Sequence, residues 1–554
     1  MFYTKMKCFA INELGIRKNF KMITKRLQAT KQHEPAVTSV NVCPNIHQPA
    51  DASLEWQRAR PFSELPKEGV FGFICKFLPG GRYYKLDSNQ LERAMHEDFG
   101  DIFIVPAVMG RPNIVVTHNP EDFACVFRNE GIWPIRPFAT LRYHRNSRHA
   151  DFYKGTEGVM TTHGEQWSSF RSILNPLLMQ PKNVHKYFSK MAQVNQEFID
   201  RIRLIRDCKT LEMPADFEDY LKRWTLESVA VVALDKQLGL LRNDSENSAD
   251  ALEMIPALNT IFTLAYDLEW KPSLWRRVST PKFRRLMQAM DDIHNLSLKY
   301  VENGIARLEA EKQRGFQRPE NEKNAFEKLL DIDQKIATVT AMDLLVAGVN
   351  TTSSMVAGVL LCLAKNTEKQ EKLRSEVDQI LPQKDGDFTA DALENIPYLR
   401  ACIKESMRVY PLSVGIVRAI QNDVVLSGYR VPKGTMVNLV SSTLLANENY
   451  YPRPLEFLPE RWLRPSKADD DHSVTEKVGA QALRPSNPFI FLPFGVGPRV
   501  CLGRRVSELE IELGIARLVR NFRIEFNYPT DKAFKSMFIN MPNIPLKFKF
   551  TDID

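Results

Sequence analysis

Apolar residues at helical spacing dominate the middle and the end of the chain. The longest such pattern covers residues 333–366, which at 1.5 Å per residue corresponds to a helix of roughly 50 Å. A second continuous pattern covers residues 504–521, and residues 216–310 are also largely helical. Short alternating segments, such as residues 101–105, predict the strands of a small sheet. The pattern therefore predicts a mainly α-helical fold with a small β region.

Composition adds that most of the chain forms one unit. The 554 residues are 44% hydrophobic, which supports a substantial core, and neither a Gly/Ser-rich linker nor an internal repeat divides them. The eight cysteines form no CxxC pair and no metal-ligand spacing, so we expect isolated thiols in a reducing compartment. We expect a leader over residues 1–45 and a single large domain over residues 46–554.

The leader carries most of the net charge. Residues 1–45 contain eight basic and two acidic residues, a net of +6 out of +8 for the whole chain. One helical face is apolar and the opposite face is basic, while no apolar run approaches the roughly 20 residues that a spanning helix needs. This composition predicts a mitochondrial transit peptide. A disordered basic tail or a surface-bound helix is the alternative, and no nucleic-acid partner is expected.

The strongest candidate chemistry lies in a glycine-rich loop just before the last long helical pattern. Cys501 faces the positive end of that helix, and Arg499 adds a nearby charge; both lower a thiol pKa and favour a metal-bound thiolate. Phe494 supplies an aromatic face, and Arg499 a partner for an anionic group. A lone thiolate ligand suits haem iron.

Five residues of this loop carry a resemblance to a known family. Phe494, Gly497, Arg499, Cys501 and Gly503 form the pattern Phe-x-x-Gly-x-Arg-x-Cys-x-Gly, which resembles the haem-binding loop of the cytochromes P-450. An ordinary buried cysteine in a Gly/Pro loop would not require five matching positions. The resemblance covers nearly everything after about residue 60, and the tail is most similar to the insect mitochondrial cytochromes P-450 of family twelve. It implies the haem-thiolate fold, haem b (iron protoporphyrin IX), and Cys501 as its axial metal ligand.

The resemblance also implies further haem contacts. Trp167 and Arg171 are four residues apart, on one helix face, and match a Trp-x-x-x-Arg motif whose side chains hydrogen-bond a haem propionate. Arg418 matches a second propionate partner. Taken without the resemblance, Trp167 and Arg171 would suggest a surface arginine packed over an aromatic ring.

The long pattern over residues 333–366 is interrupted by a glycine and several hydroxyl residues. Such a run weakens the helical hydrogen bonds and admits water, although a kink without chemical use is the alternative. The resemblance places this helix across the oxygen-binding face of haem, with Thr351 handling the bound oxygen and relaying protons. The preceding residue is usually acidic in the family, but here it is Asn350, which orders water without ionising.

Glu405 and Arg408 stand three apart on one predicted helix, a spacing that by itself is common in surface pairs. In the family these residues form a buried network with the arginine of a later Pro-Glu-Arg motif, which corresponds here to Arg461. We expect a structural role, because breaking a buried charge network is costly.

No Gly-x-Gly-x-x-Gly motif is complete and no flavin or nicotinamide domain is visible, so we expect electrons from another protein. Arg400 and Lys404, with Arg504 and Arg505, are candidate positions for docking an acidic carrier, although each alone reads as ordinary solvated charge. The resemblance implies an adrenodoxin-type 2Fe-2S ferredoxin with its NADPH-dependent reductase.

Residues 261–277 combine apolar and aromatic side chains with a basic pair, which predicts a peripheral membrane contact or, alternatively, a core-packed loop. We expect attachment to the matrix side of the mitochondrial inner membrane. The resemblance implies a monooxygenase that oxidises lipophilic small molecules, xenobiotics including insecticides. A dedicated ecdysteroid hydroxylase is the runner-up. A haem-thiolate isomerase and a non-enzymatic haem carrier or sensor are further alternatives.

Overall fold

The computed structural model describes residues 49–136, 138–242, 248–388, 390–463, 483 and 486–553. The chain divides into two compact units, residues 1–58 and 59–554. The described part of the first unit is helix α2 (Pro49–Arg58). The predicted leader over residues 1–45 lies outside the described residues.

The second unit is mainly helical, as the pattern of apolar residues predicts. Its described helices, in chain order, are η2 (Phe62–Glu64), α3 (Val70–Cys75), α4 (Ser88–Phe99), α5 (Pro120–Asn129), α6 (Ala139–Tyr143), η3 (His144–Arg148), α7 (Ala150–Tyr153), α8 (Gly164–Leu178), α9 (Pro181–Val184), η4 (His185–Tyr187), α10 (Phe188–Ile205), α11 (Phe217–Leu234), α12 (Ser248–Leu252), α13 (Met254–Glu269), η5 (Leu274–Arg276), α14 (Pro281–Gln313), α15 (Ala325–Ile332), α16 (Gln334–Lys365), α17 (Thr367–Ile380), η6 (Ala390–Asn395), α18 (Pro397–Val409), η7 (Leu444–Ala446), η8 (Pro459–Trp462), η10 (Gly497–Arg499) and α20 (Arg504–Asn521).

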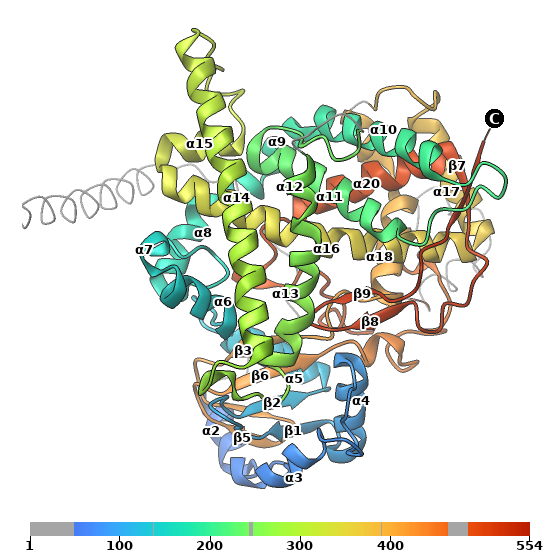
Figure 1. The fold of residues 1–554 in the computed structure, drawn as a ribbon. Coiled ribbons are helices and arrows are strands. Elements are labelled where there is room, and N and C mark those ends of the chain that lie inside the picture. Colours follow the sequence, from blue (N-terminus) through green and yellow to red (C-terminus); the bar gives the residue numbers. More distant parts are fainter. Residues whose placement is uncertain are drawn as a thin grey trace, which may run out of the picture. The chain divides into compact units, whose positions relative to one another are not determined.

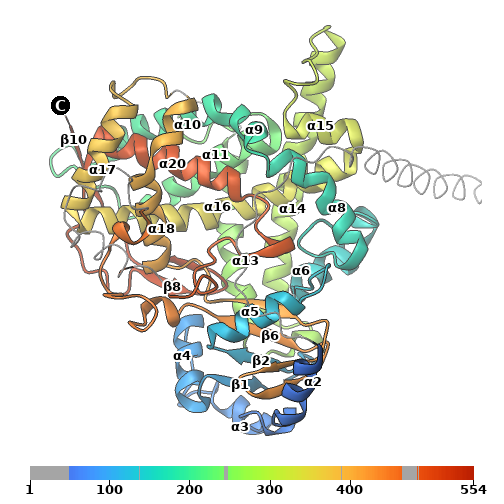
Figure 2. The same ribbon diagram turned by 180° about the vertical axis from the view of Figure 1, so that it is seen from behind.

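The described strands are short and form one larger and three smaller sheets. The larger sheet has the order β1-β2-β6-β3, in which β2 and β6 are parallel and the other neighbours antiparallel. Figures 1 and 2 show β1, β2 and β6 lying beside α3, α4 and α5, apart from the long helices. The described strands are β1 (Ile102–Val105), β2 (Ile114–Thr117), β3 (Gly415–Ala419), β4 (Val424–Leu426), β5 (Tyr429–Val431), β6 (Met436–Val440), β7 (Phe522–Glu525), β8 (Phe534–Ser536), β9 (Asn540–Pro542) and β10 (Lys549–Asp552).

Helix α16 is the central helix and matches the longest predicted pattern. It begins after Asp333, whose side chain accepts a hydrogen bond from the backbone N–H of Ile336, and it ends before Asn366. It packs against α11, α14, α15, α18 and α20. Within the described residues it alone is long and apolar enough to span a membrane, yet 72% of its most apolar stretch is buried. It is therefore a core helix.

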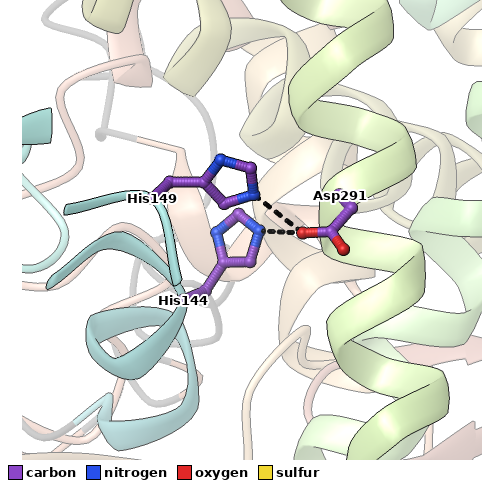
Figure 3. Close-up of side chains that lie close together, drawn as sticks. All are labelled: His144, His149 and Asp291. Carbon is purple, nitrogen blue, oxygen red and sulfur yellow. Dashed lines mark hydrogen bonds and ion pairs between the residues drawn. The ribbon is translucent and has the colours of Figure 1, made fainter. Parts of the chain in front are cut away.

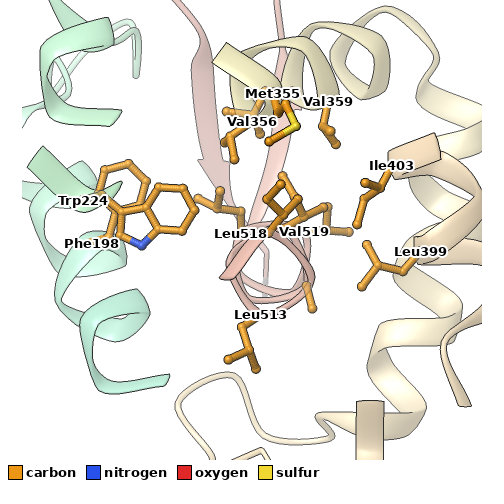
Figure 4. Close-up of a cluster of buried hydrophobic side chains, with 14 of the residues drawn as sticks. Phe198, Trp224, Met355, Val356, Val359, Leu399, Ile403, Leu513, Leu518 and Val519 are labelled. Carbon is orange, nitrogen blue, oxygen red and sulfur yellow. The ribbon is translucent and has the colours of Figure 1, made fainter. Parts of the chain in front are cut away.

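The core around α16 also holds the helix that follows the cysteine loop. Side chains of α10, α11, α16, α18 and α20 meet in one cluster, shown in Figure 4, which includes Trp224, Val356, Leu399 and Leu518. A Cβ added to Gly514 of α20 would lie 2.6 Å from the Trp224 ring, so this glycine lets the ring pack directly against α20. Burial of this kind fixes the position of α20, the helix that directly follows the cysteine loop.

The segment predicted to contact a membrane is mostly core. Tyr266 and Trp275 are 1% and 8% exposed, and the Trp275 indole N–H donates to the carbonyl of Leu268 at 2.9 Å. The exposed apolar side chains lie at Leu274 and Val278 instead. Trp275 packs against Phe283 of α14 and Tyr143 of α6, so the alternative of a core-packed segment holds for the buried aromatic residues Tyr266 and Trp275.

Candidate functional site

The cysteine loop is a tight hairpin that ends on the first turn of α20. The backbone N–H of Cys501 donates to the carbonyl of Phe494 at 2.9 Å and closes the loop. Gly495 and Gly497 adopt φ values of 72° and 70°, a left-handed conformation that other residues rarely take. The glycines therefore set the conformation of the loop. Cys501 lies three residues before Arg504, the first residue of α20.

Cys501 is accessible and yet surrounded by protein. Its side chain is exposed, but desolvation by the surrounding protein is the main influence on the thiol and raises its pKa. The Gly503 backbone N–H and the charges of Arg136 and Arg171 act in the opposite direction. The sequence predicted a lowered pKa for the Cys501 thiol. For the protein without a bound metal, that direction was wrong. A thiol in this setting becomes a thiolate when a metal binds it.

Arginines gather around the loop with few counter-charges. Burial, together with the charges of Arg136, Arg418 and Arg171, lowers the pKa of Arg499 to about 9. Burial and the charge of Arg418 likewise lower the pKa of Arg136 to about 10. Among the described residues, only Arg418 of these four forms an ion pair, with the buried Glu130. The surplus positive charge suits an anionic group such as the two propionates of haem.

Arg499 is fully engaged with the backbone. Its guanidinium donates to the carbonyls of Pro134 at 2.7 Å, Val159 at 3.0 Å and Thr162 at 3.0 Å. It also lies over the Trp167 ring, 4.0 Å from the ring centre. Arg499 therefore fastens the segment before α8 to the cysteine loop, besides adding positive charge there.

Trp167 and Arg171 lie on α8 and are both buried. Arg171 donates to the side chain of Asn175 at 2.6 Å and to the carbonyl of Val500 at 2.9 Å, next to Cys501. The structure thus brings Trp167, Arg171 and Arg499 together beside the cysteine. Their contact with a propionate stays a prediction.

Helix α16 opens on one side at its centre. Ala347 is exposed and Thr351, one turn further on, is half-buried, although the flanking turns are mostly buried. The Thr351 hydroxyl donates to the carbonyl of Ala347 at 2.6 Å. Thr351 on α16 and Cys501 before α20 both keep accessible surface, which a cofactor bound between them would need.

Asn350 is fully buried and has an amide partner that the sequence did not suggest. Its Nδ2 donates to Oδ1 of Asn259 on α13 at 2.9 Å, while its own Oδ1 has no protein partner. An unpartnered buried amide oxygen is costly unless water reaches it. The amide oxygen of Asn350 is therefore an acceptor that remains available to a water molecule.

The predicted network of Glu405, Arg408 and Arg461 is assembled in full and is almost completely buried. Arg408 donates to both oxygens of Glu405, at 3.0 and 2.8 Å, and Arg461 donates to Glu405 at 3.0 Å. The indole N–H of Trp462 and the backbone N–H of Leu458 complete the carboxylate shell at 2.9 and 3.0 Å. This network joins α18 to η8, and both elements precede the cysteine loop in the sequence.

The predicted docking residues are accessible but differ in how free they are. Arg400 donates to both oxygens of Glu512, and Arg504 and Arg505 both pair with Glu508. Lys404 is exposed. Two acidic residues therefore offset part of the positive charge that the sequence predicted for this face.

Sequence reasoning missed three residues of the site: Arg136, Glu130 and Asn259. The first two belong to a loop that mixes aromatic and charged residues, and the pairing of Glu130 with Arg418 joins positions 288 residues apart. The mixed composition was the signal available for them. Asn259 lies on an apolar helix, where a lone amide was the signal.

Comparison with known proteins gives the same picture over the whole chain. The family model described as Cytochrome P-450 matches residues 81–550. The chain is 50% identical to "Cytochrome P-450 CYP12A2" of Musca domestica over 556 residues, covering 100% of both chains. It is 53% identical to "Probable cytochrome P-450 12a5, mitochondrial" of Drosophila melanogaster, covering 90% of this chain and 92% of the relative. It is 36% identical to "Cytochrome P-450 12b1, mitochondrial" of Drosophila acanthoptera, covering 89% and 91%.

The family match covers most of the chain. It agrees with the site, where a glycine-rich loop presents an accessible cysteine among buried arginines and Thr351 lies at the open centre of α16. The chain therefore belongs to the cytochrome P-450 family, whose members are monooxygenases that use haem.

Proposed function

We propose that this chain inserts one oxygen atom of O2 into lipophilic small molecules, with xenobiotics such as insecticides as the first substrate class. The observation that carries the proposal is the pairing of an accessible Cys501 with the open centre of α16. Haem bound through that cysteine supplies the activation of dioxygen. The remaining tasks belong to the residues of the chain.

Holding the cofactor is the task of the loop and the arginines. Cys501 provides the sulfur ligand, and Phe494 packs at the root of the loop with Arg504 over its ring, 5.7 Å from the centre. Arg136, Arg171 and Arg418 supply charge for the propionates. Each guanidinium keeps its proton at pH 7, so the anionic groups would be neutralised inside the protein.

Moving protons is the task of α16. Thr351 and Asn350 are neighbours, and neither ionises at neutral pH. We assign Thr351 the hydroxyl that would hold and pass on a proton at the open side of α16, and Asn350 the amide oxygen that would order the supplying water. Asn259 keeps the amide of Asn350 in place from α13.

Electrons would arrive from a mitochondrial ferredoxin of the adrenodoxin type, reduced by its NADPH-dependent reductase. Several relatives carry the word mitochondrial in their names, which supports a mitochondrial location. Lys404, Arg400, Arg504 and Arg505 lie on α18 and on the first turn of α20, two helices that contact one another. We assign them the docking face for an acidic partner.

Peripheral attachment to the inner mitochondrial membrane would use exposed apolar side chains near the sheet. Phe71 is 81% exposed, and Val70 and Leu78 about half exposed, on and just after α3. Leu274 and Val278 add to them from η5 and its end, and the pocket shared by Phe73 and Trp270 places the two segments side by side. Apolar groups at this density suit the surface of a lipid layer.

The function is tested with purified holoprotein, a 2Fe-2S ferredoxin and its reductase. NADPH consumption and product formation are measured against a panel of insecticides, plant toxins and ecdysteroids, with the ferredoxin omitted as the control. We expect substrate-dependent turnover that requires the ferredoxin. Turnover of ecdysteroids alone would assign a dedicated hormone hydroxylase. No substrate-dependent turnover with any compound would favour a haem carrier or sensor instead.

A further inference from the structure

Two histidines and an aspartate converge outside the haem site. His144 and His149 belong to the segment between α6 and α7, and Asp291 lies on α14. The Nε2 atoms of His144 and His149 lie 3.1 and 2.8 Å from Oδ1 of Asp291, as Figure 3 shows. One ligand atom from each residue lies within 4.8 Å of the other two. Within the described part of the chain, this is the group of His, Cys, Asp or Glu side chains whose ligand atoms converge in this way.

A π-helical turn brings the two histidines onto one side. The segment His144–Arg148 is a π-helix, and the backbone N–H of His149 donates to the carbonyl of His144 at 2.9 Å, five residues back. In an α-helix, residues five apart point in different directions, whereas here the two rings lie 4.6 Å apart. Single π turns of this kind occur frequently at functional sites. The irregular backbone is thus what creates the pair of adjacent imidazoles.

The atoms that converge are those that a divalent transition metal prefers. Imidazole nitrogen and carboxylate oxygen bind zinc at about 2.0–2.1 Å, which in a tetrahedral site separates neighbouring ligand atoms by about 3.3 Å. The two separations from Asp291 Oδ1, 3.1 and 2.8 Å, need only a few tenths of an ångström of expansion, and the two histidine nitrogens lie within 4.8 Å of each other. His144 and Asp291 are buried and His149 is half-buried, so one side stays open to water.

The surroundings provide a second shell. Arg148 donates through Nε and Nη2 to Oδ2 of Asp291, the oxygen that faces away from the histidines. Ligating carboxylates are commonly held by such outer partners. Arg148 Nε also lies 2.9 Å from Oδ1, so a metal ion would have to displace that one contact.

We propose that His144, His149 and Asp291 bind one zinc ion, with water as the fourth ligand. Bound zinc would fasten the segment between α6 and α7 to α14. That segment continues toward Val159 and Thr162, whose carbonyls hold Arg499. The site shares no residue with the haem site and does not depend on the substrate or electron donor. It is therefore tested separately from the monooxygenase function.

The test uses full-length holoprotein, freed of metal with a chelator and titrated with Zn²⁺ by calorimetry, with Co²⁺ as a spectroscopic probe. We expect one zinc ion per chain and a Co²⁺ absorption spectrum typical of tetrahedral coordination. His149→Ala and Asp291→Asn should each weaken zinc binding by about 100-fold or more, since even losing an outer-shell partner costs 10- to 100-fold. Unchanged haem absorption would show that the variants are folded.

His96→Ala is the matched control. His96 also pairs with one carboxylate, Asp101, at 2.7 Å, and the His118 ring stacks on it, but the ligand atoms of these three residues do not form a converging group like the one around Asp291. We expect zinc binding of this variant to equal that of the unmodified chain. The proposal is overturned if the unmodified chain binds no zinc, since the cluster is then only an ion-pair network around Asp291. It is equally overturned if His149→Ala binds zinc as tightly as the unmodified chain.

Discussion

The hydroxyl oxygens of Thr352 and Ser507 lie 3.2 Å apart and join the middle of α16 to the first turns of α20. Thr352 directly follows Thr351, and Ser507 follows Cys501 by six positions. One hydrogen bond therefore links the helix assigned to proton transfer with the helix that supports the cysteine. Because this bond connects the two helices, a substitution at Thr352 or Ser507 would disturb both. Substitutions at Thr351 or Cys501 are therefore the better tests of each helix's own role.

Thr351→Ala should uncouple electron consumption from product formation. The hydroxyl would no longer pass a proton, and positioned proton transfer contributes typically 10²–10⁴-fold to a rate. We expect product per NADPH to fall about tenfold or more, with haem absorption unchanged. The measurement is product against NADPH consumed. Thr338→Ala removes the same type of hydroxyl-to-carbonyl bond on α16, to Gln334, and should leave the ratio unchanged. Equal ratios in both variants would remove Thr351 from the proton path.

Arg408→Met should destabilise the protein and release haem. The substitution leaves the fully buried Glu405 carboxylate with fewer partners, and breaking a buried ion pair costs about 3–5 kcal/mol. Urea unfolding and retained haem after gel filtration are the measurements. Arg82→Met removes an arginine whose half-exposed side chain pairs with Glu97 and Asp98, and it should cost less than about 1 kcal/mol. Similar losses in the two variants would contradict a special role for the buried network.

The sequence predicted the helices and the cysteine loop well, because their signals are local. Apolar periodicity marks residues 333–366, and α16 begins and ends within one residue of that range. The five spaced residues around Cys501 likewise lie within one loop. The thiol pKa was predicted in the wrong direction, because desolvation depends on atoms that arrive from elsewhere in the fold.

Contacts between distant segments were the part that sequence could not supply. Glu130 meets Arg418 and Asn259 meets Asn350 only after folding, and neither pair has a spacing that reveals it. The π turn at His144 is similar, since no periodicity in the sequence favours five residues per hydrogen bond. Tyr266 and Trp275 suggested a membrane contact, although residues from other parts of the fold bury both side chains.

Lys404→Glu should weaken binding of the ferredoxin more than Arg400→Glu does. Lys404 is exposed, whereas Arg400 is partly committed to Glu512. We expect about a tenfold loss of affinity for Lys404→Glu at low salt. The loss should shrink above about 0.15 M salt, where charges more than about 8 Å apart are screened. Lys433→Glu, an exposed lysine in the turn between β5 and β6, is the control. Unchanged affinity of Lys404→Glu at low salt would exclude this docking face.

Glu92 should make the protein less stable as the pH rises. Burial raises the pKa of this carboxyl to about 8, against a lowering charge from Arg111 and a hydrogen bond from Asn438. The folded state then holds a proton that the unfolded state loses above about pH 4.5, so stability falls with rising pH until about pH 8. Between pH 5.5 and 8 the loss is on the order of 3 kcal/mol, at about 1.4 kcal/mol per pH unit. Urea unfolding at both pH values checks it.

Glu92→Gln is the comparison, because the amide keeps the shape of the side chain but does not titrate. The unfolding free energy of this variant should change less between pH 5.5 and 8 than that of the unmodified chain. The same pH dependence in both would show that Glu92 is ionised in the folded protein throughout this range.

The central claim is that the sulfur of Cys501 holds the haem iron, and the ferrous–carbon monoxide difference spectrum of purified protein tests it most directly. The unmodified chain and Cys208→Ala, which removes an exposed cysteine elsewhere, should both show the red-shifted band of thiolate ligation. Cys501→His should retain haem and show the band of an imidazole-ligated haem instead. A thiolate-type band that persists in Cys501→His, or in Cys501→Ala, would contradict the account and place the ligand elsewhere.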